Sequence, residues 1–100
     1  MKRKITNVLV TGGAGFIGSN FIRTLLKKKN EFSGRIINLD ALTYAGNIKN
    51  LEDIEAEFGK YAVDEKEQRY FFEYADICDR EKVEAVFRKY DIDTVVHFAA

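Results

Sequence analysis

A run of glycines stands where an apolar segment gives way to a helical pattern, and this junction constrains the fold more than any other feature. The segment VTGGAGFIGSN carries four glycines, Gly12, Gly13, Gly15 and Gly18. Residues 5–11 are short and rich in β-branched side chains, which is typical of a buried strand. Residues 16–29 repeat apolar side chains at helical spacing. Because glycine is costly to order, this junction must need bare backbone.

Short apolar runs alternate with amphipathic stretches along the rest of the chain. Further strands are predicted at 35–40, 69–75 and 94–100, and residues 65–69 between them form a solvated connection. A short helix is expected to end near Gly59. Strands that are apolar throughout and alternate with helices predict a parallel sheet covered on both faces. We therefore expect an α/β fold, a doubly wound Rossmann-type sheet with four strands in the order 3-2-1-4.

The last two elements carry their own signals. Asp79 is expected to cap a helix whose apolar side chains are Val83, Val86, Phe87 and Tyr90. Residues 94–100, TVVHFAA, form an apolar strand that would leave an unpaired sheet edge. We therefore expect residues 1–100 to be the N-terminal part of a larger domain, and expect the isolated piece to self-associate through that edge or to be marginally stable.

Composition excludes several classes of protein. The 100 residues have a net charge of zero, which gives no reason to expect a nucleic-acid partner. No apolar run approaches membrane-spanning length, and no signal peptide precedes the glycines, so we expect a cytoplasmic protein without a membrane partner. Cys78, the one cysteine, is interpreted as a buried inert thiol. Lys27–Lys29 suit a helix C-terminus better than a basic binding patch.

The glycine-rich turn is interpreted as a diphosphate site. Between a strand and a helix, such a turn brings backbone N–H groups and the helix N-terminus beside a phosphate. Two registers fit, one through Gly12, Gly15 and Gly18 and the other through Gly13, Gly15 and Gly18. The structural alternative is a tight turn that only lets the helix pack closely on the strand.

Asp40 ends the second predicted strand, 22 residues after Gly18, where a dinucleotide fold places an acid for the adenosine ribose. A carboxylate there also repels a 2′-phosphate, because two like charges about 4 Å apart cost roughly 4 kcal/mol at an effective dielectric of about 20. The next residue, Ala41, carries no charge. The prediction is NAD rather than NADP, and the alternative for Asp40 is a simple turn cap.

Other candidates have weaker signals. Asp76 and Ile77 follow the third strand, where they would come near the adenine, although Asp76 could equally cap the turn before the next helix. His97 is interpreted as a packed, hydrogen-bonded strand residue rather than a catalyst. No cluster of His, Cys, Asp or Glu has the spacing of metal ligands, so no metal site is predicted.

Together, VTGGAGFIGSN, NLDALTYAGN, ADICD and VVHFAA resemble the signature of the extended short-chain dehydrogenase/reductases, and within them the nucleotide-sugar 4,6-dehydratases. The resemblance departs at EFGKYAVDEKEQRY, interpreted as a surface insertion, and at Ala75, where the family often has glycine. It implies an NAD-dependent lyase that converts dTDP-glucose to the 4-keto-6-deoxy sugar by internal redox and loss of water, and a homodimer for the complete enzyme.

The resemblance also implies roles for particular residues. Those expected at the cofactor are Gly12, Gly15, Phe16, Ile17, Gly18, Asp40, Leu42, Thr43, Gly46, Asp76, Ile77, Phe98, Ala99 and Ala100. The family's catalytic Tyr-x-x-x-Lys pair has no match here, since Tyr61, Tyr70 and Tyr74 are not followed four residues later by lysine. The 100 residues alone are therefore expected to hold no catalytic residue and to be inactive. The alternatives are another nucleotide-sugar enzyme, an epimerase or decarboxylase, or a non-catalytic nucleotide-binding module.

Overall fold

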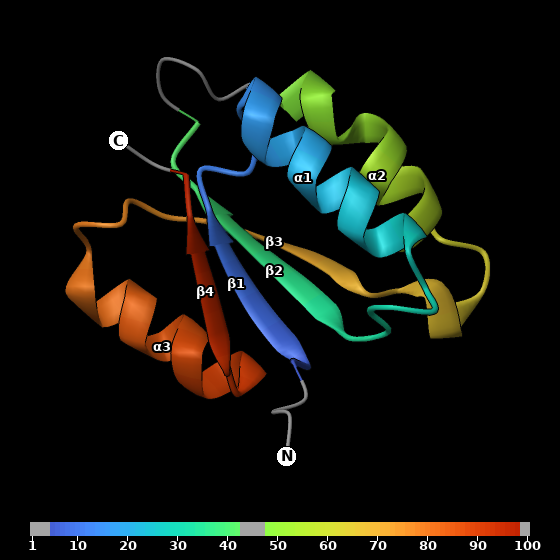
Figure 1. The fold of residues 1–100 in the computed structure, drawn as a ribbon. Helices are drawn as coiled ribbons and strands as arrows, with labels where there is room; N and C mark the ends of the chain where they lie inside the picture. The colour runs from blue at the N-terminus through green and yellow to red at the C-terminus, as the bar shows by residue number, and fades with distance from the viewer. Residues whose placement is uncertain (1–4, 43–47, 99–100) are drawn as a thin grey trace.

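A computed structural model describes residues 5–42 and 48–98. Its centre is one parallel sheet in the order β3-β2-β1-β4, which confirms the predicted doubly wound α/β fold (Figure 1). The strands are β1 (Asn7–Thr11), β2 (Arg35–Asp40), β3 (Tyr70–Tyr74) and β4 (Thr94–His97). Each lies within a segment predicted as a strand.

Helices cover both faces of the sheet. They are α1 (Phe16–Lys27), the short 3-10 helix η1 (Ile48–Leu51) that leads into α2 (Glu52–Phe58), the 3-10 turn η2 (Glu65–Glu67) and α3 (Arg80–Tyr90). Figure 1 shows α1 and α2 on one face and α3 on the other. Right-handed connections explain this, because β1, β2 and β3 follow one another in one direction and the chain then returns past β1 to form β4.

Alternate residues of each strand supply the two halves of the core. In β1, Val8 and Val10 pack under α1 and α2, while Leu9 belongs to the cluster on the α3 side. In β2, Ile36 faces α1 and α2, and Ile37 faces α3. This two-residue period leaves both faces of the central strands buried, as the apolar strand sequences predict.

The helix ends follow the predicted chemistry. Asp79 caps α3, and its side chain accepts a hydrogen bond from the backbone N–H of Lys82 at 3.2 Å. The first helix ends at Lys27, and Lys28 is its C-cap, so these cations lie at the negative end of the helix dipole.

The connection before β3 is exposed over residues 63–66, as the predicted surface insertion requires, but it is buried where it joins β3. Phe58 and Tyr70, at its ends, are buried, and Arg69 is only 8% exposed. The Arg69 guanidinium donates to the carbonyl oxygens of Leu26 at 2.7 Å and Gly34 at 3.1 Å. An arginine in a charged stretch of sequence is expected to be exposed to water. Here, carbonyl oxygens at the C-terminal end of α1 and in the following loop accept the hydrogen bonds that water would otherwise accept from the guanidinium.

The prediction of a buried thiol is wrong, because Cys78 is exposed in the turn that leads from β3 to α3.

The predicted unpaired sheet edge at β4 is confirmed. Within residues 5–42 and 48–98, β4 pairs with β1 alone, and Val95 is 49% exposed.

Candidate functional site

The glycine-rich turn lies at the carboxyl end of β1, and its glycines serve different purposes. Gly12 has φ +74°, in the left-handed region that favours glycine. Gly15 is the N-cap of α1 and is extended, with φ −73° and ψ 170°, a conformation open to any residue. A Cβ on Gly18 would lie 2.5 Å from the carbonyl oxygen of Gly12, so Gly18 permits close packing of helix on turn. The geometry supports the register through Gly12, Gly15 and Gly18.

The N-terminus of α1 differs from that of α3. Within the described residues, Gly15 provides no side-chain cap and the first turn of α1 contains no acidic residue, whereas α3 has Asp79 as its cap and Glu81 in its first turn. The first N–H groups of a helix lack partners inside the helix and carry its positive dipole end. Phe16 and Ile17 stand beside them, 76% and 71% exposed. This end of α1 has the features of an anion-binding helix terminus.

Asp40 lies beside this turn, at the end of β2, and is 8% exposed. One carboxylate oxygen accepts the backbone N–H of Ala14 at 2.8 Å, and the other accepts that of Leu42, also at 2.8 Å. The turn cap considered as the alternative for Asp40 is therefore present. It leaves ligand binding open, because each carboxylate oxygen can accept a second hydrogen bond.

Leu42, before residues 43–47, and Asn50, after them, are both hydrogen-bonded to residues of the turn region. Leu42 has φ +57°, which is uncommon for a side chain of this size, and its N–H is held by Asp40. On the other side, the Asn50 side chain donates to the carbonyl oxygen of Ala14 at 2.9 Å. Thr43 and Gly46, predicted on the adenosine side, lie outside the described residues.

The carboxyl ends of β3 and β4 hold the remaining predicted residues. Asp76 accepts the N–H of Cys78 at 2.9 Å, which is the turn-capping alternative, and Ile77 is exposed. Phe98 donates its N–H to Thr11 at 2.8 Å, and its ring contacts Phe21 of α1 with centroids 5.4 Å apart. Ala99 and Ala100 lie outside the described residues.

His97 is hydrogen-bonded through Nδ1 to the Thr11 hydroxyl, across the β1–β4 pair. That hydrogen bond was predicted, but the expected packing is only partial, because the residue is exposed.

Two contributors to the turn were not singled out from the sequence, namely Asn38 and Asn50. The Asn38 side-chain oxygen accepts the N–H of Gly13 at 3.0 Å from below the turn. A polar residue in the middle of the apolar run RIINLD was the available signal for Asn38. Asn50 had no comparable signal, since asparagine is ordinary at the start of a helix.

A charged pair holds α2 against α1 beside the turn. The Arg23 guanidinium contacts the Asp53 carboxylate at 2.5 Å and also donates to the carbonyl oxygen of Asn50 at 2.9 Å. The hydrogen bond from Arg23 lowers the pKa of Asp53, despite some opposing desolvation. Through Asn50, this pair steadies the segment that contacts Ala14.

The described residues contain neither a metal-binding cluster nor a membrane-spanning helix. No group of three or more His, Cys, Asp or Glu in this part of the chain could hold a metal ion. No helix among residues 5–42 and 48–98 is long and apolar enough to cross a membrane.

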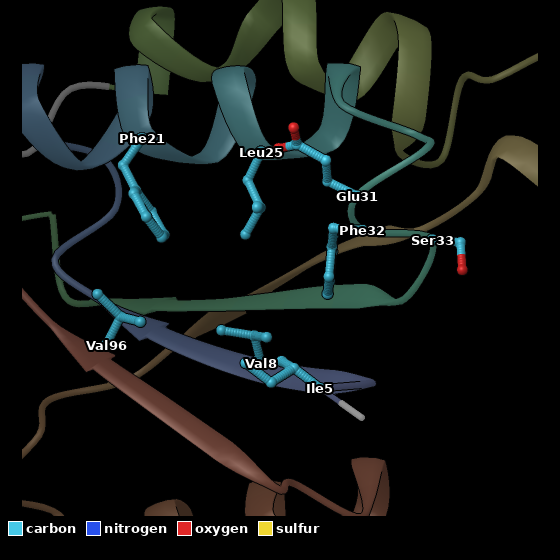
Figure 2. Close-up of a pocket in the computed structure, with 8 residues that line it drawn as sticks. All are labelled: Ile5, Val8, Phe21, Leu25, Glu31, Phe32, Ser33 and Val96. Carbon is cyan, nitrogen blue, oxygen red and sulfur yellow. The ribbon is translucent and has the colours of Figure 1, made fainter. Parts of the chain in front are cut away.

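A pocket of about 430 Å³ opens elsewhere, between α1 and the sheet (Figure 2). Phe21 and Leu25 of α1 point toward Val8 and Val96 across it, and Phe32 closes one end. Its walls are mainly hydrocarbon. It contains none of the predicted cofactor residues and adds to the apolar surface near β4.

The fold and the turn define a class, the Rossmann-type α/β proteins, with a glycine-rich turn after β1 and an acid at the end of β2. Within this class, the chain belongs to the GDP-mannose 4,6 dehydratase family, whose model matches residues 9–100.

Individual relatives narrow the similarity. The chain is 42% identical over 93 residues to the dTDP-glucose 4,6-dehydratase of Salmonella typhimurium, covering 93% of this chain and 22% of the relative. The dTDP-glucose 4,6-dehydratase of Bacillus anthracis, solved in complex with NAD, matches with a TM-score of 0.78 and 40% identity over 95% of this chain and 27% of that one. The dTDP-glucose 4,6-dehydratase of Streptomyces venezuelae, also solved with NAD, matches with a TM-score of 0.76 and 41% identity. That match covers 95% of this chain and 26% of the Streptomyces chain. The chain spans less than a quarter of the length of the curated relative.

Proposed function

We propose that this chain is the N-terminal, NAD-binding part of a dTDP-glucose 4,6-dehydratase. The observation that carries the proposal is the N-terminus of α1 behind a glycine-rich turn, which no side chain caps among the described residues, with the Asp40 carboxylate hydrogen-bonded to that turn. The similarity to dTDP-glucose 4,6-dehydratases solved with NAD supports both the cofactor and the substrate.

The residues present fit NAD. The N–H groups at the start of α1, from Phe16 and Ile17, would bind the diphosphate, since no side chain caps them in the described structure. Gly15 would let the diphosphate approach the backbone, and the exposed side chains of Phe16 and Ile17 would cover it. Asp40 would accept hydrogen bonds from the adenosine ribose. The residues proposed to line the adenosine side of the cofactor are Leu42, Thr43, Gly46, Asp76 and Ile77. Those proposed to approach the cofactor from the end of β4 are Phe98, Ala99 and Ala100.

Selectivity for NAD over NADP follows from the charge of Asp40. The carboxylate is fixed by two backbone N–H groups and cannot swing away from a 2′-phosphate without breaking those hydrogen bonds. A fixed charge in a mostly buried position discriminates more strongly than a mobile one in water.

When bound, NAD supplies the acceptance and return of hydride that 4,6-dehydration of a sugar requires. The residues of this chain bind and orient that cofactor, and we assign none of them a proton-transfer role. A homodimeric complete enzyme and a cytoplasmic location, expected from the resemblance and the composition, stay predictions.

The test is product formation by the complete protein. Incubation with dTDP-glucose is expected to yield the 4-keto-6-deoxy product, and GDP-mannose or UDP-glucose under the same conditions much less. Exclusive turnover of another nucleotide sugar would overturn the substrate assignment. Epimerised sugar without loss of water would overturn the reaction class.

A further inference from the structure

One polar side chain beneath the turn is unusual for its position. Asn38 lies in the middle of β2, opposite Val10 of β1, and is 0% exposed. Its neighbours Ile37 and Leu39 belong to the core on the α3 side. A buried amide costs free energy unless its hydrogen bonds are made, so an apolar side chain would be the ordinary choice here.

The hydrogen bonds of Asn38 fix its orientation. Its Oδ1 accepts the Gly13 N–H at 3.0 Å, and its Nδ2 donates to the Tyr70 hydroxyl at 3.0 Å. The Gly13 N–H can only donate, so the amide oxygen must face the turn. Tyr70 is 2% exposed, and burial raises its pKa, which keeps the hydroxyl neutral.

This contact explains the fourth glycine. A Cβ on Gly13 would lie 2.4 Å from Asn38 Oδ1 and 2.6 Å from Ile22 Cδ1. Gly13 is therefore bare because the turn packs closely on the Asn38 amide of β2 and on Ile22 of α1.

Asn38 and Asp40 act as a pair, two residues apart on the same face of β2. Asn38 holds the N–H of Gly13, and Asp40 holds that of Ala14 at 2.8 Å. Two consecutive N–H groups of the turn are thus bound by side chains of β2, next to the Gly12 N–H, which donates to the Leu39 carbonyl oxygen at 3.1 Å. The Gly15 N–H donates to the Gly12 carbonyl oxygen at 3.4 Å, and within the described residues the N–H groups of the first turn of α1 are the donors left for an anion.

We propose that Asn38 is a positioning residue of the cofactor site: by holding the Gly13 N–H, it sets the turn so that the start of α1 faces the diphosphate of NAD. This inference rests on the proposed function, because it takes NAD as the ligand. Asn38 itself is buried below the turn and acts only through Gly13.

The test compares variants of the complete protein by NAD titration and by amide hydrogen exchange. Asn38→Leu keeps similar volume but removes the acceptor, and is expected to weaken NAD binding about tenfold, as for one lost hydrogen bond, and to speed exchange at Gly13. Asn38→Ala, which cannot overpack, replaces it if the leucine variant does not fold. The matched control is Tyr90→Phe, which removes a tyrosine hydrogen bond on the α3 side. It should lower stability and leave NAD affinity unchanged.

The outcomes separate the two claims. If the unmutated protein does not bind NAD, both the proposed function and this inference are overturned. If it binds NAD but Asn38→Leu binds equally well, only the inference is overturned. The same holds if Tyr90→Phe loses as much affinity. In the unmutated protein, a Gly13 amide that exchanges as fast as that of Phe16 without NAD would contradict the inference with no variant at all.

Discussion

The carboxylate of Asp40 accepts a hydrogen bond from the backbone N–H of Ala14 at 2.8 Å, and this contact ties the end of β2 to the turn after β1. The residue expected to select the ribose therefore also shapes the turn expected to bind the diphosphate. Its substitutions should therefore affect cofactor affinity and stability together.

Asp40→Ala is expected to weaken NAD binding at least tenfold and to affect NADP far less, because the ribose acceptor and the repulsive charge are lost together. It should also cost about 1–3 kcal/mol of unfolding free energy, since two backbone N–H groups lose their acceptor. Asp40→Asn removes the charge and one of the two acceptor oxygens, so it should narrow the difference between NAD and NADP affinity at a smaller cost in stability than Asp40→Ala. Titrations with both cofactors check this. Equal affinity of the unmutated protein for the two would contradict it.

Two glycine substitutions should separate binding from folding. Gly15→Ala fits the extended backbone at that position, so it should leave the melting temperature nearly unchanged and still weaken NAD binding. Gly18→Ala would bring a Cβ to 2.5 Å from the Gly12 carbonyl oxygen, so it should cost about 1–3 kcal/mol of stability. Thermal unfolding with NAD titration measures both. The reverse order of melting temperatures would count against the assigned roles.

Arg69→Met tests the buried cation. The variant leaves carbonyl oxygens of Leu26 and Gly34 without their donor, and is expected to lower the unfolding free energy by about 2–3 kcal/mol. The control is Arg80→Met, at an exposed side chain, expected within about 0.5 kcal/mol of the unmutated protein. Urea denaturation compares them, and equal stabilities of the two variants would refute the role of Arg69.

The lowered pKa of Glu73 should make the free energy of unfolding depend on pH. Burial opposes its ionisation, but hydrogen bonds from the Tyr90 hydroxyl at 2.6 Å and the Lys89 ammonium at 3.3 Å outweigh it, and its pKa is lowered. A lowered folded-state pKa adds stability above the unfolded value of about 4.5, and this is lost as the pH falls through the folded-state pKa. Glu73→Gln should remove about 1 kcal/mol at pH 7 and less at pH 3. Denaturation at both values checks this, and an equal loss at both pH values would exclude it.

The edge at β4 predicts self-association of the chain of 100 residues. Val95 is half exposed on a strand that pairs on one side within the described residues, and the apolar pocket beside Phe21 and Val96 adds surface. Val95→Lys should reduce association, because a charge on an edge strand opposes pairing with a second strand. Sedimentation at several concentrations measures it. A cooperative monomer at high micromolar concentration would mean that this edge does not pair.

The sequence predicted the fold well because hydrophobic periodicity and glycine placement are local signals. Alternation of strands and helices predicted the order β3-β2-β1-β4, and Asp79 marked the start of α3. The burial of Arg69 could not be predicted, because its partners are carbonyl oxygens in α1 and in the loop that follows it, far away in the chain.

The geometry of the glycine-rich turn was predicted only in part, because some of its contacts are not local in sequence. The turn glycines and Asp40 have a fixed spacing, but Asn38 contacts Gly13 across 25 positions of sequence, and no motif records that contact. The left-handed backbone at Leu42 was equally hidden, since nothing in the residue type indicates it.

Binding of NAD at the glycine-rich turn is tested most directly by adding NAD to the isotope-labelled protein and following its backbone amide chemical shifts. We expect saturable shifts concentrated at Gly15, Phe16 and Ile17 and at Asp40 and Leu42, with little change at Leu25 or Val96 in the apolar pocket. Shifts centred on that pocket, or no saturable shifts at the glycine turn, would contradict it.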